Sequence, residues 1–545
     1  MGISEQAESV RRDAGERDAS PWWRVPLVAR VPVVARVPLV SIAVVVPLYA
    51  LWAFWLATGG GDLAAQLAWA GFMERHPASA YNLSWYGGTH TANYSLLAPP
   101  LMAVFGVRAV SVAAGLVGTW VLARLFVRSQ VPRPVWPAVL GAVALWCNVA
   151  SGRTTFALGV AIGLLVLLYV RRTAVAALCT ALAAMASPVA GLFLVVAGAA
   201  YLLDRQWRKA AALVLPPFVV VGVVTLLFPF QGEQPMATGK LWMPLAASAA
   251  VAVAAPRGHE WRVVRYGAAV YGLGVVLTYL IASPIGTNVE RLVGLVGPPV
   301  LLAAVLTAGL GRFLRAVLAA ALALNTYWLI DKTNDDLLVS NDVPAWAAHT
   351  DGVVRELERL GAGRTRVEVV PARNHREASL LAPHINMARG WNRQLDVERG
   401  RLFYDGALTP ATYRQWLDRW AVGLVVLHHG RPDGPAEAEA AIVRSGPGWL
   451  ERVWQDEGWS VYRVRDAVPL VSSPATVVRG DDAELVVRMP AAGSVRVRVA
   501  YSPWLRARGA CLRQEGEWTR LTVPRAGEYR LDSPYRLSRS ADSDC

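Results

Sequence analysis

Apolar stretches alternate with short polar connections along residues 37–330. A helix that crosses the hydrocarbon core of a membrane needs about 20 predominantly apolar residues. We predict about eleven spans, some of them short, near residues 38–58, 107–127, 134–150, 154–170, 173–186, 188–203, 210–229, 241–256, 266–283, 290–309 and 313–330. The count depends on a break at Ser187-Pro188, because one kinked helix there would reverse the topology of the chain beyond it.

The hydrophobic pattern changes after residue 330. Residues 331–466 combine helical spacing in WAAHTDGVVRELERL with buried-strand patterns in TRVEVVP and AVGLVVLHH, which indicates an α/β region. Residues 467–545 contain short alternating strands separated by Gly, Pro and Asp, which is typical of a β-sandwich. The sequence therefore predicts a polytopic α-helical membrane protein with a C-terminal unit made of an α/β region and a β-sandwich-like module.

Charge supports the membrane bundle and orients it. Only 17% of the residues are charged, against roughly 25% in soluble domains, and the net charge is +14. The arginines cluster in every second connection, which indicates positive-inside membrane topology rather than a nucleic-acid partner. This predicts a cytoplasmic basic tail (1–36), a bundle (37–330) with a long outer loop (59–106), and an extracytoplasmic C-terminal unit.

The long outer loop opens with three glycines and Asp62. Asp62 precedes an apolar helix predicted over residues 63–76, where an aspartate is a favoured N-cap. Trp85, Tyr86 and Tyr94 follow in NLSWYGGTHTANYSLLAPPL and offer flat surfaces for sugars or lipids. An aromatic belt at the membrane surface explains the same residues. Capping and catalysis both remain open for Asp62 at this stage.

Three further polar residues of this loop are candidates for substrate binding: Glu74, His76 and His90. The histidines suit a donor phosphate, an acceptor or a divalent cation, or they are plain surface residues. Two histidines without nearby acids are weak evidence for a metal site, so we predict none. Among the cysteines, Cys511 and Cys545 are able to pair if the C-terminal unit is exported.

Two shorter outer loops each carry an arginine among polar residues. The first, NVASGRTTF, contains Arg153, and the second, SPIGTNVERL, contains Asn288 and Arg291. A guanidinium fork matches phosphate oxygens bidentately, so these residues are candidates for binding a lipid phosphate. A snorkelling membrane anchor is the alternative for each arginine alone.

The GGGDL and WYGGTHTANYSLLAPP motifs resemble the GT-C superfamily of polytopic glycosyltransferases. Members of that superfamily have a catalytic acid just after the first span, a long first outer loop and often a C-terminal outer domain. More narrowly, SGRTTF, GTNVERL and ARGWNRQLD…LFYDG look like segments of uncharacterised actinobacterial membrane proteins of this type. The chain departs from the many members with paired acids, because Asp62 has no acidic neighbour in the sequence.

The resemblance implies an enzyme of the bacterial plasma membrane that transfers a sugar, with inversion, from a polyprenyl phosphate. The acceptor would be an envelope glycan, lipid or protein on the outer face, and membrane lipids surround the bundle. Asp62 would be the general base, Arg291 would stabilise the departing phosphate, and Arg153 would be a second phosphate ligand. No cofactor is firmly implied, and a divalent cation stays open. ARGWNRQLD, with Arg389, Trp391 and Arg393, is expected to pack over the membrane site.

Two other classes of protein fit parts of the pattern. A transporter of the major-facilitator type is supported by the number of spans, although none of the acids lies in the middle of a predicted span. A non-catalytic envelope scaffold would use the bundle as an anchor for the outer unit. Whatever the class, the sandwich-like module would bind glycan acceptors through exposed aromatics such as Trp504 and Trp518, unless these tryptophans belong to its core.

Overall fold

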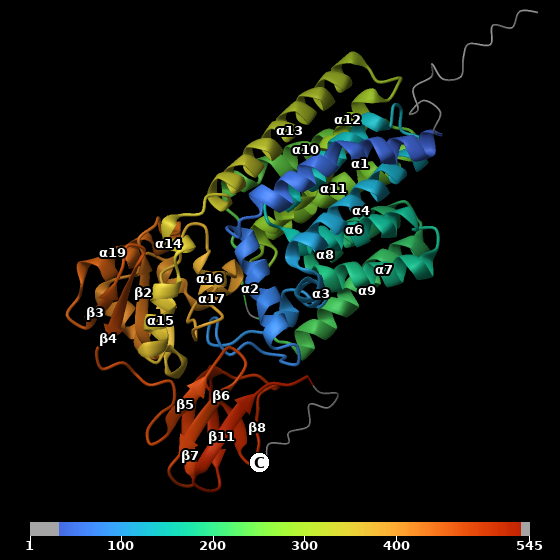
Figure 1. The fold of residues 1–545 in the computed structure, drawn as a ribbon. Coiled ribbons are helices and arrows are strands. Elements are labelled where there is room, and N and C mark those ends of the chain that lie inside the picture. Colours follow the sequence, from blue (N-terminus) through green and yellow to red (C-terminus); the bar gives the residue numbers. More distant parts are fainter. Residues whose placement is uncertain (1–31, 231, 536–545) are drawn as a thin grey trace, which may run out of the picture.

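A computed structural model describes residues 32–230 and 232–535, and it places two smaller units at one end of a helical bundle (Figure 1). The described part of the bundle contains eleven helices at the predicted positions. They are α1 (Val33–Leu51), α4 (Val107–Arg128), α5 (Val135–Ala150), α6 (Thr154–Leu168), α7 (Thr173–Ala186), α8 (Pro188–Leu203), α9 (Trp207–Leu227), α10 (Trp242–Ala254), α11 (His259–Leu280), α12 (Glu290–Leu306) and α13 (Arg312–Ser340).

Six of these helices are long and apolar enough to cross a membrane, by length and composition, and the other five are shorter apolar helices. Helices α7 and α8 are separate, as predicted, because Ser187 has an extended backbone (φ −155°, ψ 117°) and Pro188 begins α8. Helix α13 continues to Ser340, well past the predicted boundary at residue 330. Its last turns therefore belong to the end of the bundle that faces the two smaller units.

Small side chains let the bundle helices approach closely. A Cβ added to Gly191 of α8 would lie 2.8 Å from the Cβ of Ala184 of α7, and Gly198 packs as tightly against α9. Large apolar side chains face outward instead: Phe54, Phe105, Phe218 and Phe313 are all more than half exposed. This inside-out distribution suits a bundle that lipid surrounds.

The first of the two smaller units is an α/β unit built on one four-stranded sheet. The sheet order is β1-β2-β4-β3; β1 and β2 are parallel, and the other pairs are antiparallel. The strands are β1 (Arg366–Val369), β2 (Val422–His428), β3 (Leu450–Gln455) and β4 (Trp459–Val464). The helices are α14 (Ala345–Ala348), α15 (Asp351–Arg359), α16 (Glu377–Leu380), α17 (Arg393–Arg399), α18 (Pro410–Arg419) and α19 (Glu437–Ser445).

The second unit is a β-sandwich with sheets β7-β10-β9 and β5-β6-β11-β8. Its strands are β5 (Thr476–Gly480), β6 (Leu485–Met489), β7 (Gly493–Ala500), β8 (Arg506–Ala507), β9 (Cys511–Glu515), β10 (Trp518–Val523) and β11 (Gly527–Asp532). Buried and exposed residues alternate along β7 and β10, so the predicted strand pattern is confirmed. Trp504 and Trp518 are buried, so the hypothesis that they bind glycans as exposed aromatics is wrong.

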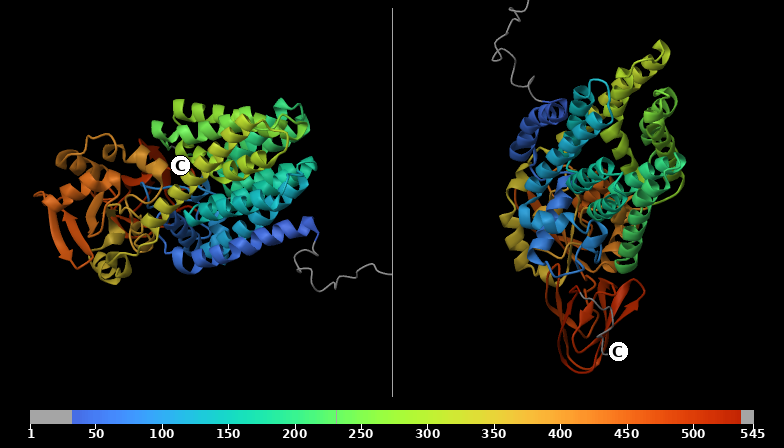
Figure 2. Two further views of the ribbon diagram at one scale, coloured as in Figure 1. Left: turned by 90° about the horizontal axis from the view of Figure 1, so that it is seen from above. Right: turned by 90° about the vertical axis from the view of Figure 1, so that its right-hand side faces the viewer.

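The long loop after α1 ties the bundle to both units. Its helices are α2 (Asp62–Arg75) and α3 (Ala98–Phe105). Trp85 and Tyr86 belong to the apolar core of the α/β unit, whereas Tyr81 and Leu83 belong to the core of the sandwich. Figure 1 shows α2 between the bundle and the α/β unit, and Figure 2 shows the bundle and the two units from two further sides. The loop is therefore held on both sides, which fixes the position of Asp62.

Candidate active site

Asp62 is the first residue of helix α2, and Gly61 occupies the capping position with a φ of 64°. The prediction that Asp62 caps this helix is wrong, because Gly61 is the N-cap residue and Asp62 already belongs to the first turn. Glycine adopts a positive φ at little cost, so Gly61 takes the cap position and turns the chain there. The Asp62 side chain is left 38% exposed and lines a cavity.

The loop between α5 and α6 packs directly on the start of α2. Gly152 has a φ of 76°, and a Cβ at this position would lie 2.7 Å from the backbone nitrogen of Leu63. Only a glycine allows this approach without a shift of one of the two backbones. The next residue, Arg153, then places its Nε atom 3.7 Å from Oδ2 of Asp62. The SGR motif therefore places Arg153 next to the candidate base.

A second carboxylate, Asp336 on helix α13, holds the same arginine. Arg153 Nη2 lies 2.7 Å from Asp336 Oδ2. The expectation that Asp62 has no acidic partner is therefore corrected: the two acids share Arg153 in space although they are far apart in the sequence. Sequence reasoning missed Asp336 because residues from 331 onward were assigned to the outer unit. The uninterrupted helical spacing of RAVLAAALALNTYWLIDKTNDDLLVS is the signal that would have revealed it.

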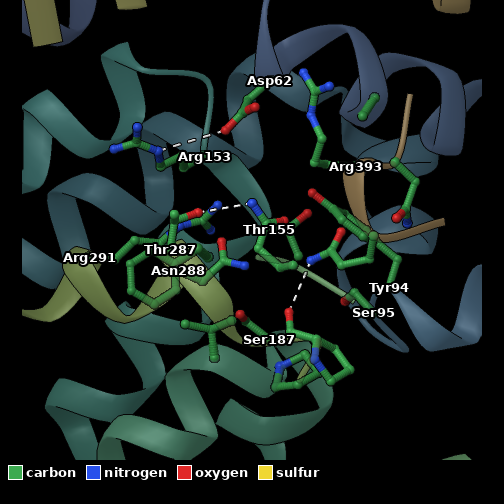
Figure 3. A pocket seen from close by; sticks show the side chains of 18 of the residues that line it. Asp62, Tyr94, Ser95, Arg153, Thr155, Ser187, Thr287, Asn288, Arg291 and Arg393 are labelled. Carbon is green, nitrogen blue, oxygen red and sulfur yellow. Dashed lines mark hydrogen bonds and ion pairs between the residues drawn. The ribbon is translucent and has the colours of Figure 1, made fainter. Parts of the chain in front are cut away.

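The cavity has a volume of about 500 Å³ and lies where the bundle meets the α/β unit. All the connections predicted on the outer side between residues 59 and 291 contribute to its wall, which is consistent with their lying at one end of the bundle. Figure 3 shows Asp62, Arg153, Thr155, Asn288 and Arg291 around this space. The polar and aromatic lining also includes Trp69, His90, Tyr94, Ser95, Asn148, Ser187, Gln234, Lys240, Thr287, Glu290, Trp328, Lys332, Thr333 and Trp391 to Gln394.

The positive charges of the cavity are only partly neutralised. Arg153 pairs with Asp336, and Lys332 Nζ lies 3.3 Å from Oε2 of the buried Glu290. Arg291 lies over the ring of Phe156, with its guanidinium carbon 5.4 Å from the ring centroid. Within residues 32–230 and 232–535, Arg291 forms no ion pair or hydrogen bond, so its donors are available to a ligand.

Tyr94 enters the cavity from the long loop and is held by a short chain of hydrogen bonds. Gln66 Nε2 donates to the Tyr94 hydroxyl, and Thr155 Oγ1 donates to Gln66 Oε1. Burial raises the pKa of Tyr94, so the phenol stays neutral. Gln66 lies one turn after Asp62 on α2, which places the phenol and the carboxylate on the same wall of the cavity.

The α/β unit covers the cavity with the segment ARGWNRQLD, as expected from the sequence. Trp391 stacks on His375 with a centroid distance of 3.4 Å, and Arg393 lies against the same ring. Arg393 also pairs with Asp433 at 2.8 Å. Arg389, by contrast, is buried inside the α/β unit between Glu368 and Glu439 and does not line the cavity.

Four of the predicted substrate-binding residues lie away from the cavity. Glu74 is exposed on α2, and His76 Nε2 donates to Asp482 Oδ1 of the sandwich at 2.7 Å. Trp85 and Tyr86 are buried by packing against the α/β unit, which removes them as surfaces for a sugar. The structure thus brings together Asp62, His90, Tyr94, Arg153, Asn288 and Arg291.

His90 lines the cavity but is already engaged. Its Nδ1 lies 2.9 Å from the carbonyl oxygen of Ala80, and its Nε2 lies 3.1 Å from Ser502 Oγ. The one group of described residues with metal-binding spacing lies elsewhere, at His76, Asp481 and Asp482. Arg75 Nη2 also contacts Asp482, at 2.6 Å, which disfavours a cation there.

A family model described as a domain of unknown function (DUF8823) matches residues 472–513, in the sandwich. No curated protein matches the chain. The solved structures that match include arabinofuranosyltransferase AftD from Mycobacteria, with 18% identity and a TM-score of 0.41 over 78% of this chain and 40% of that one. A mutant of the same protein gives 17% identity and a TM-score of 0.43, over 78% and 42% of the two chains.

The chain thus spans about two fifths of the length of these neighbours. They are glycosyltransferases, the class of enzyme that the sequence resembles. Both TM-scores lie below 0.5. Cys545, which the sequence leaves open as a partner of Cys511, lies outside the described residues, as do residues 1–31 of the predicted basic tail.

Proposed function

We propose that the protein is a membrane glycosyltransferase that moves a sugar from a polyprenyl phosphate to an acceptor hydroxyl on the outer face of the membrane. The observation that carries this proposal is the placement of Asp62 and the unpaired Arg291 in one cavity at the end of the bundle. A carboxylate and an arginine are the two groups that such a transfer needs, one for the attacking hydroxyl and one for the departing phosphate.

The lining of the cavity fits an amphiphilic donor. Its apolar residues include Val189, Val220, Val221, Val224, Leu295 and Leu329. Val221 also remains 42% exposed on α9, so the apolar part of the lining continues onto a helix face that lipid would cover. The same cavity contains Arg291 and Lys240, which have no ion pair among the described residues. A lipid tail matches the apolar side chains, and a phosphodiester matches the two basic groups.

The proposed reaction is a single displacement at the anomeric carbon. The acceptor oxygen forms a bond to this carbon while the bond from the carbon to the phosphate oxygen breaks. The bonding electrons leave with the phosphate, which Arg291 stabilises as a polyprenyl monophosphate. The proton of the acceptor hydroxyl moves to Asp62 as general base. Attack opposite the leaving phosphate inverts the configuration of the sugar.

Arg153 is proposed to orient Asp62 in this reaction. Its contact with Asp62 is longer, at 3.7 Å, than its contact with Asp336, at 2.7 Å. Arg153 therefore interacts more strongly with Asp336 than with Asp62, and an oxygen of Asp62 remains free to accept a proton. Asn288 and Tyr94 add neutral hydrogen-bonding groups to the wall, which suit the hydroxyls of a sugar.

The position of the cavity favours an enzyme over the alternative transporter. Residues of the α/β unit, from Trp391 to Gln394, close the cavity on the side away from the bundle. A carrier needs a site that opens alternately to both sides near the middle of the membrane. A site at the junction of two units suits a reaction between a membrane donor and an acceptor outside the membrane.

The test is a transfer assay with the full chain in nanodiscs. Polyprenyl-phosphate pentoses and hexoses with a labelled sugar are offered with envelope glycan, lipid and protein fractions, and matched nucleotide sugars serve as the control donors. We expect labelled product and released polyprenyl phosphate from at least one lipid donor and none from nucleotide sugars. An absence of both from every lipid donor would overturn the proposal.

A further inference from the structure

A second cavity lies at the carboxyl ends of the two parallel strands of the α/β unit. Its volume is about 330 Å³. Arg373 and His375 follow strand β1, and the segment 431–434 follows strand β2. In open α/β sheets, the crevice outside the carboxyl ends of the strands is the usual place for ligands. The second cavity therefore has the position of a binding site in its own unit.

This cavity also reaches the candidate base, between the α/β unit and the end of the bundle that carries Ser151 and Asp336. Asp62, Trp391 and Arg393 line both cavities, whereas Asp336 lines only the second. Trp391 contacts His375 and Arg393, so it is a fixed part of the lining that the two cavities share. One carboxylate is thus accessible from two cavities, which is the arrangement that a reaction between two different substrates requires.

The two cavities have different chemistry. The first contains many apolar side chains from bundle helices, but the second is lined mainly by charged and polar groups. These groups are Asp62, Ser151, Asp336, Ser340, Arg373, His375, Arg393, Arg431, Asp433 and Glu437. Such a lining leaves no place for a lipid tail. It offers donors and acceptors of hydrogen bonds in roughly equal measure, which suits a ligand rich in hydroxyl groups.

The rim of the second cavity is fixed by backbone pairing. The Arg373 N–H donates to the carbonyl oxygen of Arg431 at 2.9 Å, and Ala372 forms an antiparallel bridge with Pro432. Both arginine side chains are exposed and form no ion pair among the described residues. Glu437, the first residue of α19, adds an exposed carboxylate to the same rim. The backbone thus presents two guanidinium groups and a carboxylate at the opening.

We propose that the second cavity binds the acceptor and that the acceptor is a hydrophilic glycan chain that enters over Arg373, Arg431 and Glu437. This inference rests on the proposed glycosyltransferase activity and assigns the α/β unit a substrate-binding role. The terminal hydroxyl of the glycan reaches Asp62 past Trp391, while the donor occupies the first cavity. The reaction is the displacement described above, and its proton goes to Asp62.

Two measurements on the full chain in nanodiscs test this inference. The first is saturation-transfer-difference NMR with a panel of neutral arabino-, manno- and galacto-oligosaccharides. The second is the transfer assay with the same oligosaccharides, with KM measured separately for donor and oligosaccharide. The test variant is the double substitution Arg373→Ala with Arg431→Ala. The control is Arg355→Ala, which removes an exposed arginine of α15 outside both cavities.

We expect the double variant to raise KM for the oligosaccharide about tenfold or more, as the loss of charged hydrogen bonds implies, without a change in KM for the donor. The NMR signal of the bound oligosaccharide should weaken in the double variant and persist in Asp62→Asn and Arg355→Ala. An unchanged oligosaccharide KM, or an equal rise in both KM values, would overturn the inference. Absence of NMR binding to the wild type by the whole panel would also overturn it.

The two measurements separate the two proposals. If the oligosaccharide binds, and binding depends on Arg373 and Arg431, but no lipid donor supports transfer, the proposed function fails and the site stands. If transfer occurs and the double variant leaves it unaffected, the site fails and the proposed function stands.

Discussion

Arg153 and Asp336 form an ion pair of 2.7 Å that joins the loop between α5 and α6 to the last turns of α13. The same guanidinium lies 3.7 Å from Asp62. Asp336 thus holds Arg153, the arginine that faces the candidate base. No contact of Asp336 with the reacting atoms is proposed. We regard it as a positioning residue.

Replacing Asp336 with asparagine should free Arg153 to pair fully with Asp62. Transfer should fall by about tenfold or more, because the base is then neutralised and misplaced. Folding should change little, since a partly exposed ion pair contributes roughly 0–1 kcal/mol to stability. The pH profile of kcat should shift as well, which a purely structural role would not produce. Asp335→Asn, one residue earlier and exposed, is the matched control, and equal rates for both variants would refute this role.

Gly152→Ala tests the close approach between the SGR loop and α2. The added Cβ would lie 2.7 Å from the backbone nitrogen of Leu63, and φ is 76°. The strain should cost on the order of 1–2 kcal/mol and move Arg153 away from Asp62. We expect a large loss of transfer with a modest fall in melting temperature. Gly222→Ala, in α9 with open space around its Cβ, should leave transfer unchanged and should not lower the melting temperature, because alanine has the higher helix propensity. Wild-type transfer by the Gly152 variant would show that the approach is dispensable.

Arg291→Gln should weaken donor binding. The side chain keeps a polar group but loses its charge and its fork, which together should cost about ten- to a hundredfold in affinity for a phosphodiester. The measurement is binding of a fluorescent polyprenyl-phosphate sugar to the protein in nanodiscs. Arg312→Gln is the control, because Arg312 begins α13 at the opposite end from Ser340. Unchanged donor affinity in Arg291→Gln would remove its phosphate role.

His76 links α2 to the sandwich in a pH-dependent way. The hydrogen bond to Asp482 raises the pKa of His76 above its ordinary value of 6.5, and the negative charge of Asp481 raises this pKa further. Burial and the positive charge of Arg75 lower the pKa, but their effect is smaller. A raised pKa in the folded state gives stability that is complete below pH 6.5 and is lost as the pH rises through the shifted pKa. The melting temperature of the wild type should therefore fall from pH 6 to pH 9 more than that of His76→Gln.

The control for this comparison is His349→Gln, which removes an exposed histidine of the α/β unit. Its melting temperature should follow the wild type across the whole pH range. Parallel curves for wild type and His76→Gln would show that this pair makes no difference to the attachment of the sandwich.

The sequence predicted the parts of this molecule that local pattern determines. The eleven apolar helices, the break at Ser187 and the alternating strands of the sandwich follow from helix length, proline placement and side-chain periodicity. Asp62 and Arg291 could be selected as candidates from the sequence because charged residues are few in the outer connections. These features depend on neighbours in the sequence or on composition alone.

The rest depended on contacts between distant segments. Asp336 joins Asp62 only because α13 extends beyond the membrane segment. Trp85 and Tyr86 look like exposed aromatics in the sequence, but the α/β unit buries them. The second cavity needs strands β1 and β2 to be parallel neighbours, which their sequences do not specify. Long-range packing therefore determines which of the candidate residues line a cavity and which are buried in a core.

The most direct measurement is the rate of sugar transfer by Asp62→Asn, in nanodiscs saturated with a polyprenyl-phosphate sugar that supports wild-type transfer. Asparagine keeps the size and hydrogen bonding of the side chain but does not accept the proton, so the rate should fall by about a hundredfold to ten-thousandfold with donor binding intact. Transfer at the wild-type rate would contradict the assignment of Asp62 as the base and, with it, the central claim about this cavity.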